Sequence, residues 1–433
     1  MDRKQFLRDT GLALGVGLTY PASLRYNSLF LGESFDSWLD IRNQFPLEKG
    51  KIHMAQMLLA SHPKPVKDAI ENHRENFNEN PTEYWENNFT TAEPKVLESA
   101  AAYLEAQPGE IALTDSTTQG LGTLYTGFKL EEGDEVLTTT HDHYSTEKSL
   151  EFAAQKNGAT IRRISLYENP SEVSVDEVVE RLADAIRPST KLVAVTWVHS
   201  STGVKLPIRA LVDAILAVNA ERNPSNRIYL SVDGVHGFGI ENITMEELGC
   251  DFFVAGTHKW LFGPRGTGIL WAKEDAWDKV IPTIPPFSYS AYGMYLGMIP
   301  EGKLNFSDAF SPGGFHAFDH RWALNEAFDF HMKIGKDNVE RRTHFLSSML
   351  KEGLREINHV TLHTPVSAEL SSGINCFEID GMTPAEVVAR LYERNIVGST
   401  SPYRTSYARL TPCIINTEEE VEACIRAVEE IRA

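Results

Sequence analysis

Two spacings of apolar residues alternate along most of the chain. Continuous apolar runs at residues 111–114, 135–139, 192–198 and 228–232 are typical of strands that are buried on both faces. Between the last two runs, residues 208–219 place apolar side chains about 3.6 positions apart, which indicates an amphipathic helix. Strands that alternate with helices predict an α/β fold with a mostly parallel sheet.

The most informative stretch covers residues 227–270, where three apolar runs follow one another closely. The first ends on Asp233, and the second, residues 251–255, leads into Gly256, Thr257, His258 and Lys259 before a Gly-rich turn and a third run. A carboxylate and a lysine therefore leave the ends of two buried strands, where open α/β sheets bind ligands. Apolar surroundings lower the pKa of a lysine and make its amine a useful nucleophile.

The other elements follow from the same patterns. Upstream, we expect helices over residues 65–77 and 92–106 with a loop at 78–80. The Pro- and aromatic-rich residues 282–295 predict an irregular loop, and residues 320–334 predict one long helix. Beyond it, helices at 339–353, 384–393 and 418–431 with strands at 360–363, 373–379 and 407–411 predict a smaller α+β domain.

Two further strand ends carry polar residues. Thr117 and Thr118 follow the run 111–114, where the free N–H groups of a helix N-terminus favour a phosphate, although a simple helix cap reads the same way. His141, Asp142 and His143 follow the run 135–139 and suggest a metal. Alternate residues of an extended segment point to opposite sides, and no other His/Cys cluster completes a site, so we predict no metal.

Composition narrows the function classes. The chain has 433 residues, 42% of them hydrophobic and 23% charged, which is ordinary for a soluble globular protein. A net charge of −19 argues against a nucleic-acid partner, and no apolar stretch reaches the ~20 residues of a membrane span. The four cysteines have no C-x-x-C spacing and indicate neither a zinc site nor a disulfide framework.

Residues 1–24 admit two interpretations. A basic segment with Arg3 and Lys4 precedes an apolar stretch, which resembles a twin-arginine export signal whose second arginine is replaced by lysine. The alternative is an amphipathic helix that ends near Pro21. Periplasmic and cytoplasmic locations both stay open.

The spacing of Asp233, His236 and the triplet Thr257-His258-Lys259 resembles the class V aminotransferase family of pyridoxal phosphate (PLP) enzymes. That family includes cysteine desulfurases and isopenicillin N epimerase. The resemblance implies fold type I, with a large PLP-binding domain over residues 25–319, a seven-stranded type of sheet and a small domain over 320–433. It also implies that Asp233 pairs with the pyridinium nitrogen and that Lys259 forms the Schiff base.

The resemblance assigns the remaining roles by position. It assigns binding of the cofactor phosphate to Thr117, Thr118 and His258. It assigns stacking on the cofactor ring to His143, with Tyr144 as the second choice. Ser200 stands where relatives have an Asn that contacts the ring hydroxyl, so His199 or Ser201 could supply that contact instead. The substrate contacts are Arg409, for the α-carboxylate, and His53 and Gln56.

The reaction is less constrained than the cofactor. In the implied chemistry Lys259 moves the Cα proton of an amino-acid-like substrate. No Cys lies near residues 394–395, where one desulfurase branch has its reactive thiol, so an enzyme persulfide is disfavoured. The D-x-x-H motif, the His143-Tyr144 pair and residues 80–85 look more similar to isopenicillin N epimerase. We therefore expect an epimerase or aminotransferase type of enzyme, with a C–S lyase as the alternative.

Two more expectations complete the interpretation. A non-catalytic PLP-fold binding protein is the hypothesis from another class, and the joint presence of Lys259, Asp233 and Arg409 argues against it. The loop at 311–316 corresponds to a segment that reaches the neighbouring subunit's cofactor in the family. We therefore expect a homodimer.

Overall fold

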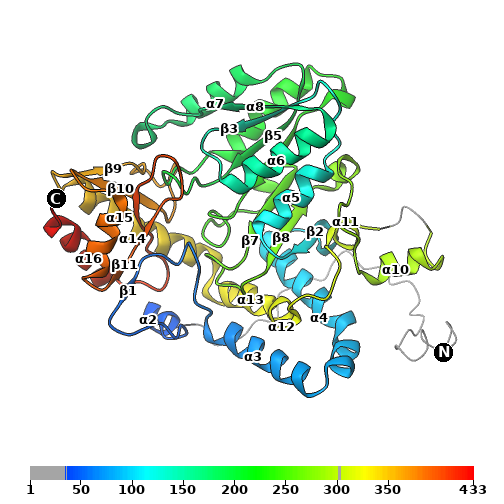
Figure 1. Cartoon of the computed structure of the whole chain (residues 1–433), viewed down its shortest axis with the longest axis horizontal. Coiled ribbons are helices and arrows are strands. Elements are labelled where there is room, and N and C mark those ends of the chain that lie inside the picture. The colour runs from blue at the N-terminus through cyan, green and yellow to red at the C-terminus, as the bar shows by residue number, and fades with distance from the viewer. Residues whose placement is uncertain (1–34, 36, 301–303) are drawn as a thin grey trace.

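The computed structural model describes residues 35, 37–300 and 304–433 (Figure 1). The predicted export signal or helix at residues 1–24 lies outside this part. A seven-stranded sheet has the order β2 (Ile111–Thr114), β8 (Gly268–Ala272), β7 (Phe252–Gly256), β6 (Tyr229–Asp233), β5 (Thr190–Thr196), β3 (Glu135–Thr139), β4 (Thr160–Ile164). Only β8 runs antiparallel to its neighbours, so the predicted α/β fold with a mostly parallel sheet is confirmed.

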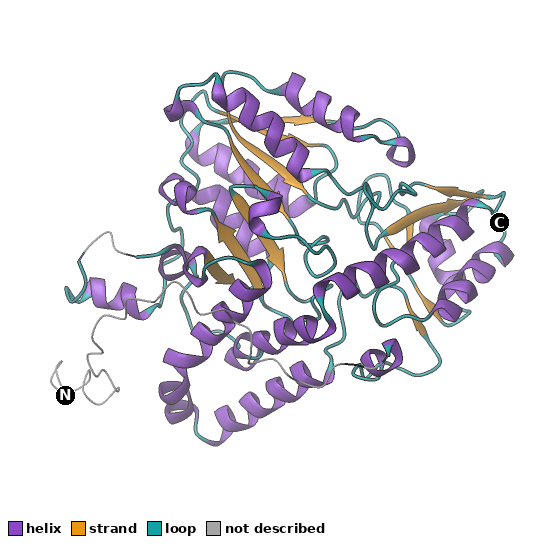
Figure 2. Ribbon diagram, turned by 180° about the vertical axis from the view of Figure 1, so that it is seen from behind, coloured by secondary structure: helices purple, strands orange, loops and turns teal. Residues whose placement is uncertain are grey.

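Helices cover both faces of this sheet (Figure 2). Successive side chains of a strand point to opposite faces, so each strand contributes to the core on either side. In β7, Phe252 and Val254 join the core formed with α5 (Thr117–Gly127) and α6 (Tyr144–Asn157). Phe253 and Ala255 join the opposite core, formed with α7 (Val175–Ala185), α8 (Ile208–Ala220) and α9 (Met245–Leu248). Figure 2 shows the resulting three layers. Strands buried on both faces explain the continuous apolar runs.

The N-terminal helices differ from their predicted bounds. After α2 (Trp38–Arg42), α3 (Lys64–Glu79) is followed by α4 (Pro81–Leu104), so the predicted loop at 78–80 is reduced to Asn80, which caps α4. Pro81 is the first residue of α4, where a missing N–H is no loss. α4 continues through Pro94, so the start predicted at residue 92 is wrong. Packing against α3 and α13 (Leu324–Ile334) stabilises it there.

Two other predictions between residues 282 and 334 need correction. The segment predicted as irregular contains α10 (Tyr289–Tyr295), whose first turn is capped by Ser288. It is followed by α11 (Phe306–Phe310). The helix predicted over 320–334 is two helices, α12 (Phe318–Trp322) and α13, that meet at Ala323.

The C-terminal part is a second, smaller α+β unit, as predicted. A four-stranded antiparallel sheet has the order β12 (Ser399–Thr400), β13 (Ala408–Leu410), β10 (Asn375–Ile379), β9 (Val360–Leu362). The helices α14 (Lys336–Arg355), α15 (Pro384–Tyr392) and α16 (Glu418–Glu430) pack with it in a separate core.

The N-terminal segment reaches this unit through β1 (Ile52–His53), which pairs in parallel with β11 (Ile396–Val397). The domain boundary at 319/320 stays a prediction. Within the described ranges, no helix combines the length and the apolar character that crossing a bilayer requires.

Candidate active site

Lys259 lies in the turn that joins the antiparallel strands β7 and β8, whose ends pair as Gly256 with Gly268. The turn is braced from inside. Gly263 N donates to Thr257 O over 2.9 Å, and Phe262 N donates to Lys259 O over 3.1 Å. Burial lowers the pKa of Lys259, the charge of Asp233 opposes this shift, and the charge of Arg409 adds to it. The sequence thus presents a desolvated amine from a fixed backbone.

His236 lies within hydrogen-bond distance of that amine. Its Nε2 lies 3.3 Å from Lys259 Nζ, and its Nδ1 accepts a hydrogen bond of 3.2 Å from the indole of Trp260. Burial lowers the pKa of His236 well below its ordinary value, so the imidazole is neutral. Because Nδ1 is an acceptor, the single ring proton is on Nε2 and faces Lys259.

Asp233 ends β6 and is 1% exposed. Its carboxylate accepts from Val235 N over 3.2 Å and lies 3.5 Å from Thr146 Oγ1. Burial raises its pKa, and these hydrogen bonds and Lys259 only partly offset the shift. A buried carboxylate with so few partners is suited to pairing with a protonated ring nitrogen.

The N-terminus of α5 forms a candidate phosphate site. Thr117 Oγ1 accepts a hydrogen bond of 2.8 Å from Gly256 N. A Cβ at Gly256 would lie 2.8 Å from that oxygen and 3.2 Å from His258 Cε1, so only glycine leaves this space open. In the described part of the chain His258 Nδ1 is buried without a hydrogen-bond partner, and burial lowers the pKa of His258 to about 4. The side chain of Thr118 is exposed, which leaves its backbone N–H as the group in the first turn.

His143 caps α6 and accepts from Ser145 N over 3.2 Å. Burial lowers its pKa, and the charges of Lys259 and Arg409 lower it further. Tyr144, the reserve choice for ring stacking, is 66% exposed. Stacking by His143 stays a prediction.

The neighbouring Asp142 and His141 have structural contacts instead. Asp142 accepts hydrogen bonds of 2.7–2.9 Å from Thr138, from the backbone and side chain of Thr139, and from Thr196 N. His141 stacks on Tyr167 with ring centroids 4.0 Å apart. These bonds fix the end of β3.

Elsewhere in the described ranges, one group brings three possible metal ligands within 4.8 Å: Glu241, Glu340 and His344. Lys205 Nζ lies 2.6 Å from Glu241 Oε2 and already supplies positive charge there.

Arg409, in β13, is 2% exposed. Its guanidinium donates to Ser200 O over 2.9 Å, to Thr400 O over 2.7 Å and to Ser399 Oγ over 3.2 Å. Three of its five N–H groups are thus used within the described ranges, which leaves one N–H on each terminal nitrogen to donate to a carboxylate. Ser200 Oγ lies 2.8 Å from the hydroxyl of Tyr403, a residue that the sequence patterns did not single out.

The other predicted contacts are placed as follows. His53 Nε2 lies 3.4 Å from Glu48 O, and Gln56 is buried with its Oε1 accepting from Ser61 N over 2.8 Å. Both stay predictions as substrate contacts. Of the alternatives to Ser200, His199 binds Tyr167 through Nδ1, and within the described ranges both His199 Nε2 and Ser201 Oγ are buried without a hydrogen-bond partner.

These residues fit PLP. Lys259 can bond it covalently, Asp233 can hold its ring nitrogen, and the unpartnered His258 Nδ1 beside the α5 N-terminus can hold its phosphate.

Comparisons with known proteins identify the family and the fold. The chain is 26% identical over 348 residues to isopenicillin N epimerase of Streptomyces clavuligerus, covering 77% of this chain and 83% of that protein. It is 25% identical to a probable cysteine desulfurase of Halalkalibacterium halodurans, covering 75% and 78%. The fold superposes on the cystine C–S lyase C-DES with a TM-score of 0.78 at 22% identity, covering 89% and 99%. The family model "Aminotransferase class-V" matches residues 60–424. The chain therefore belongs to the class-V aminotransferase family and is a PLP-dependent enzyme.

Proposed function

We propose that this enzyme acts at Cα of an amino acid or amino-acid derivative, as an epimerase or aminotransferase of the isopenicillin N epimerase-like branch. The observation that carries the proposal is the desolvated amine of Lys259, 3.3 Å from the neutral His236 and close to the charge of Arg409. Bound PLP supplies an electron sink at Cα. The chain's own part is to hold the carboxylate with Arg409 and to move the Cα proton with Lys259.

The cysteines support this choice over sulfur transfer through an enzyme persulfide. All four are buried: Cys250, Cys376, Cys413 and Cys424. Burial raises the pKa of Cys376 and of Cys413 to about 12, so these thiols stay protonated and unreactive. A C–S lyase, whose substrate brings its own sulfur, is the second candidate, because it needs no thiol of the enzyme.

Incubation of amino acids with the holoenzyme in heavy water separates the two candidates. We expect Cα–H exchange with inversion and without released thiol; keto acid would identify the aminotransferase type. Thiol release that tracks turnover would contradict the proposal and establish the lyase. The purified protein should show a visible absorption band that disappears on treatment with borohydride. The absence of such a band would contradict PLP chemistry.

We also propose a homodimer that uses the face around residues 311–316. Phe315 is 80% exposed and lines a cavity of about 660 Å³ whose wall includes the aromatic side chains of Trp85, Phe287 and Phe318, and Tyr295 of α10 is 81% exposed. His316 Nδ1 lies 3.2 Å from Asp115, two residues before Thr117, so the loop lies beside the candidate phosphate site. Sedimentation equilibrium should give twice the chain mass, and Phe315→Arg should weaken the association. A monomer at all concentrations would contradict the proposal.

A further inference from the structure

Tyr403 lies in a short loop between β12 and β13. Arg409 lies in β13 and donates hydrogen bonds to Ser399 and Thr400 of β12. The loop is closed at its base. Ser401 N donates to Tyr407 O over 3.0 Å, and Tyr407 N donates to Ser401 Oγ over 2.9 Å. Ser406 Oγ adds a hydrogen bond of 2.6 Å to Ser401 O. The loop therefore has a fixed path, and the position of Tyr403 is a property of the fold.

The side chain of Tyr403 points into the candidate site. Its hydroxyl lies 2.8 Å from Ser200 Oγ, and its ring meets that of His143 edge-on, with centroids 6.1 Å apart. Ser200 also accepts a hydrogen bond from Arg409 through its carbonyl. Tyr403 and Arg409 thus converge on one residue of the large domain.

The pair of hydroxyls has one hydrogen to spare. Tyr403 and Ser200 each carry one O–H hydrogen, and the bond between them uses one. A phenol is a stronger acid than an aliphatic hydroxyl and is therefore the better hydrogen-bond donor. An anion beside the pair thus accepts a hydrogen bond from Tyr403, while Ser200 donates to the phenol oxygen. Burial raises the pKa of Tyr403, so the phenol keeps its proton at neutral pH.

We propose that Tyr403 is a substrate-binding residue whose hydroxyl donates to the α-carboxylate held by Arg409, with Ser200 supporting it from behind. The inference rests on the proposed function, since it needs an amino-acid substrate. The two free N–H groups of Arg409 and the phenol hydrogen then surround the carboxylate with three donors. An amide in place of the carboxylate carries no charge and gains little from them.

The competing explanation is that Tyr403 only ties the loop to Ser200. The test uses the holoenzyme with a panel of α-methyl amino acids, which lack the Cα proton, and the corresponding amides. The absorbance change of the cofactor on titration gives a Kd for each. The variants are Tyr403→Phe, Ser200→Ala, the double variant, and Tyr407→Phe as a control in the same loop, where the ring stacks on His363.

We expect Tyr403→Phe to weaken binding of the acids by about ten- to a hundredfold, as for a lost hydrogen bond to a charged group, and to leave the amides nearly unchanged. Ser200→Ala should have a smaller effect, and the double variant should match Tyr403→Phe. In Tyr403→Phe the Kd for PLP should stay at the wild-type level, and Tyr407→Phe should match the wild type in its Kd for the acids and the amides.

Two results would overturn the inference while leaving the proposed function intact. One is an unchanged Kd for the acids in Tyr403→Phe. The other is an equal loss for acids and amides, with Ser200→Ala as impaired as Tyr403→Phe, which is the pattern of a structural tie. A wild-type holoenzyme that responds to no probe would contradict the proposed function itself, and with it the carboxylate that Tyr403 is proposed to bind.

Discussion

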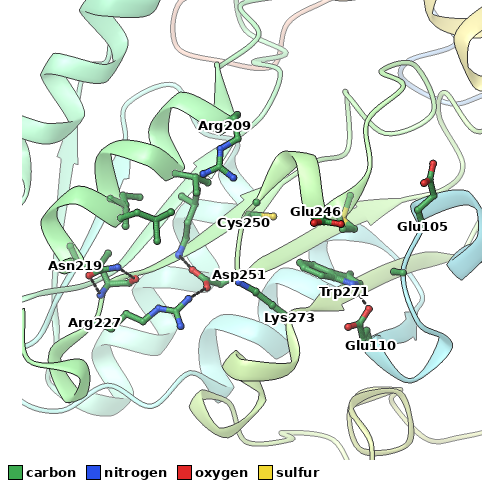
Figure 3. A pocket seen from close by; sticks show the side chains of 18 of the residues that line it. Glu105, Glu110, Arg209, Asn219, Arg227, Glu246, Cys250, Asp251, Trp271 and Lys273 are labelled. Carbon is green, nitrogen blue, oxygen red and sulfur yellow. Dashed lines mark hydrogen bonds and ion pairs between the residues drawn. The ribbon is translucent and has the colours of Figure 1, made fainter. Parts of the chain in front are cut away.

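The two ends of the parallel strands in the large sheet, here called its two edges, differ in whether their buried polar side chains have hydrogen-bond partners. At the edge where β6 and β7 end, several buried polar atoms have no hydrogen-bond partner within the described ranges: His258 Nδ1, His199 Nε2, Ser201 Oγ and Thr196 Oγ1. At the edge where the same strands begin, a cavity of about 500 Å³ is lined by charged residues (Figure 3), and none of its buried side-chain nitrogen or oxygen atoms lacks a partner in the described part of the chain.

The contacts in this second cavity show how complete the pairing is. Asp251 pairs with Arg227 and accepts from Leu230 N over 2.7 Å. Asn219 exchanges two hydrogen bonds with the backbone of Ile228, and the indole of Trp271 donates to Glu110 over 3.3 Å (Figure 3). An opening whose buried polar groups are all paired thus marks a structural edge, whereas unpartnered buried groups mark the edge that can bind a ligand.

The largest contrast should appear between two lysines, one from each edge. Lys259→Ala should abolish covalent attachment of PLP and lower turnover by about 10²–10⁴-fold or more, because the proton carrier is lost. Lys273→Ala, at the structural edge and half-exposed, should leave both unchanged. Mass spectrometry after borohydride reduction and a turnover assay measure the two effects. Turnover that survives in Lys259→Ala would refute its role.

Two aspartates give the second contrast, in stability. Asp251→Asn should lower the free energy of unfolding by about 1–2 kcal/mol, because it removes one of the two carboxylates that pair with Arg227 and leaves only Asp275. Asp233→Asn should change the stability of the cofactor-free protein by less than about 1 kcal/mol, because its carboxylate has only two long hydrogen bonds and no arginine partner within the described ranges. Urea unfolding compares them. Equal destabilisation would contradict the distinction between the edges.

The smallest expected effect is on the pH dependence of stability. Burial, with a smaller contribution from His199, lowers the pKa of His141 to about 3 from an ordinary 6.5. The folded protein therefore favours the neutral ring, so this stability is complete above pH 6.5 and is lost as the pH falls toward 3. His141→Phe keeps an aromatic ring against Tyr167 and should reduce the loss between pH 7.5 and 5 by about 1–2 kcal/mol. An unchanged loss in urea titrations would contradict this assignment.

Regular elements were predictable where one face or both faces are apolar throughout. The helix expected at 418–431 is α16 (Glu418–Glu430), and the run 251–255 matches β7. The start of α4 was missed because Asn80 and Pro81 are turn residues elsewhere but cap and first residue here. Packing of α4 against distant helices, which no local pattern encodes, explains its continuity through Pro94.

Residues of the candidate site were predictable where they directly follow a buried strand. Asp233 and Lys259 have that position, and the charge of each opposes the pKa shift that burial gives the other. Tyr403 has no such signal, because it lies in a loop and meets Ser200 only through the tertiary fold across some two hundred positions of sequence. An aromatic residue in the short loop that precedes Arg409 was the one available hint.

The antiparallel direction of β8 limits how Lys259 can move. Gly256 and Gly268 face each other across the β7–β8 ladder, and Thr257 N donates to Thr267 O over 3.2 Å, so both ends of the lysine's turn are anchored. The backbone cannot move far without breaking the pairing of β7 with β8. Lys259 can therefore change from bonding a ligand to carrying a proton only by rotation about the bonds of its flexible four-carbon side chain. Such rotation in accessible side chains takes picoseconds to nanoseconds, so the turn itself need not open during turnover.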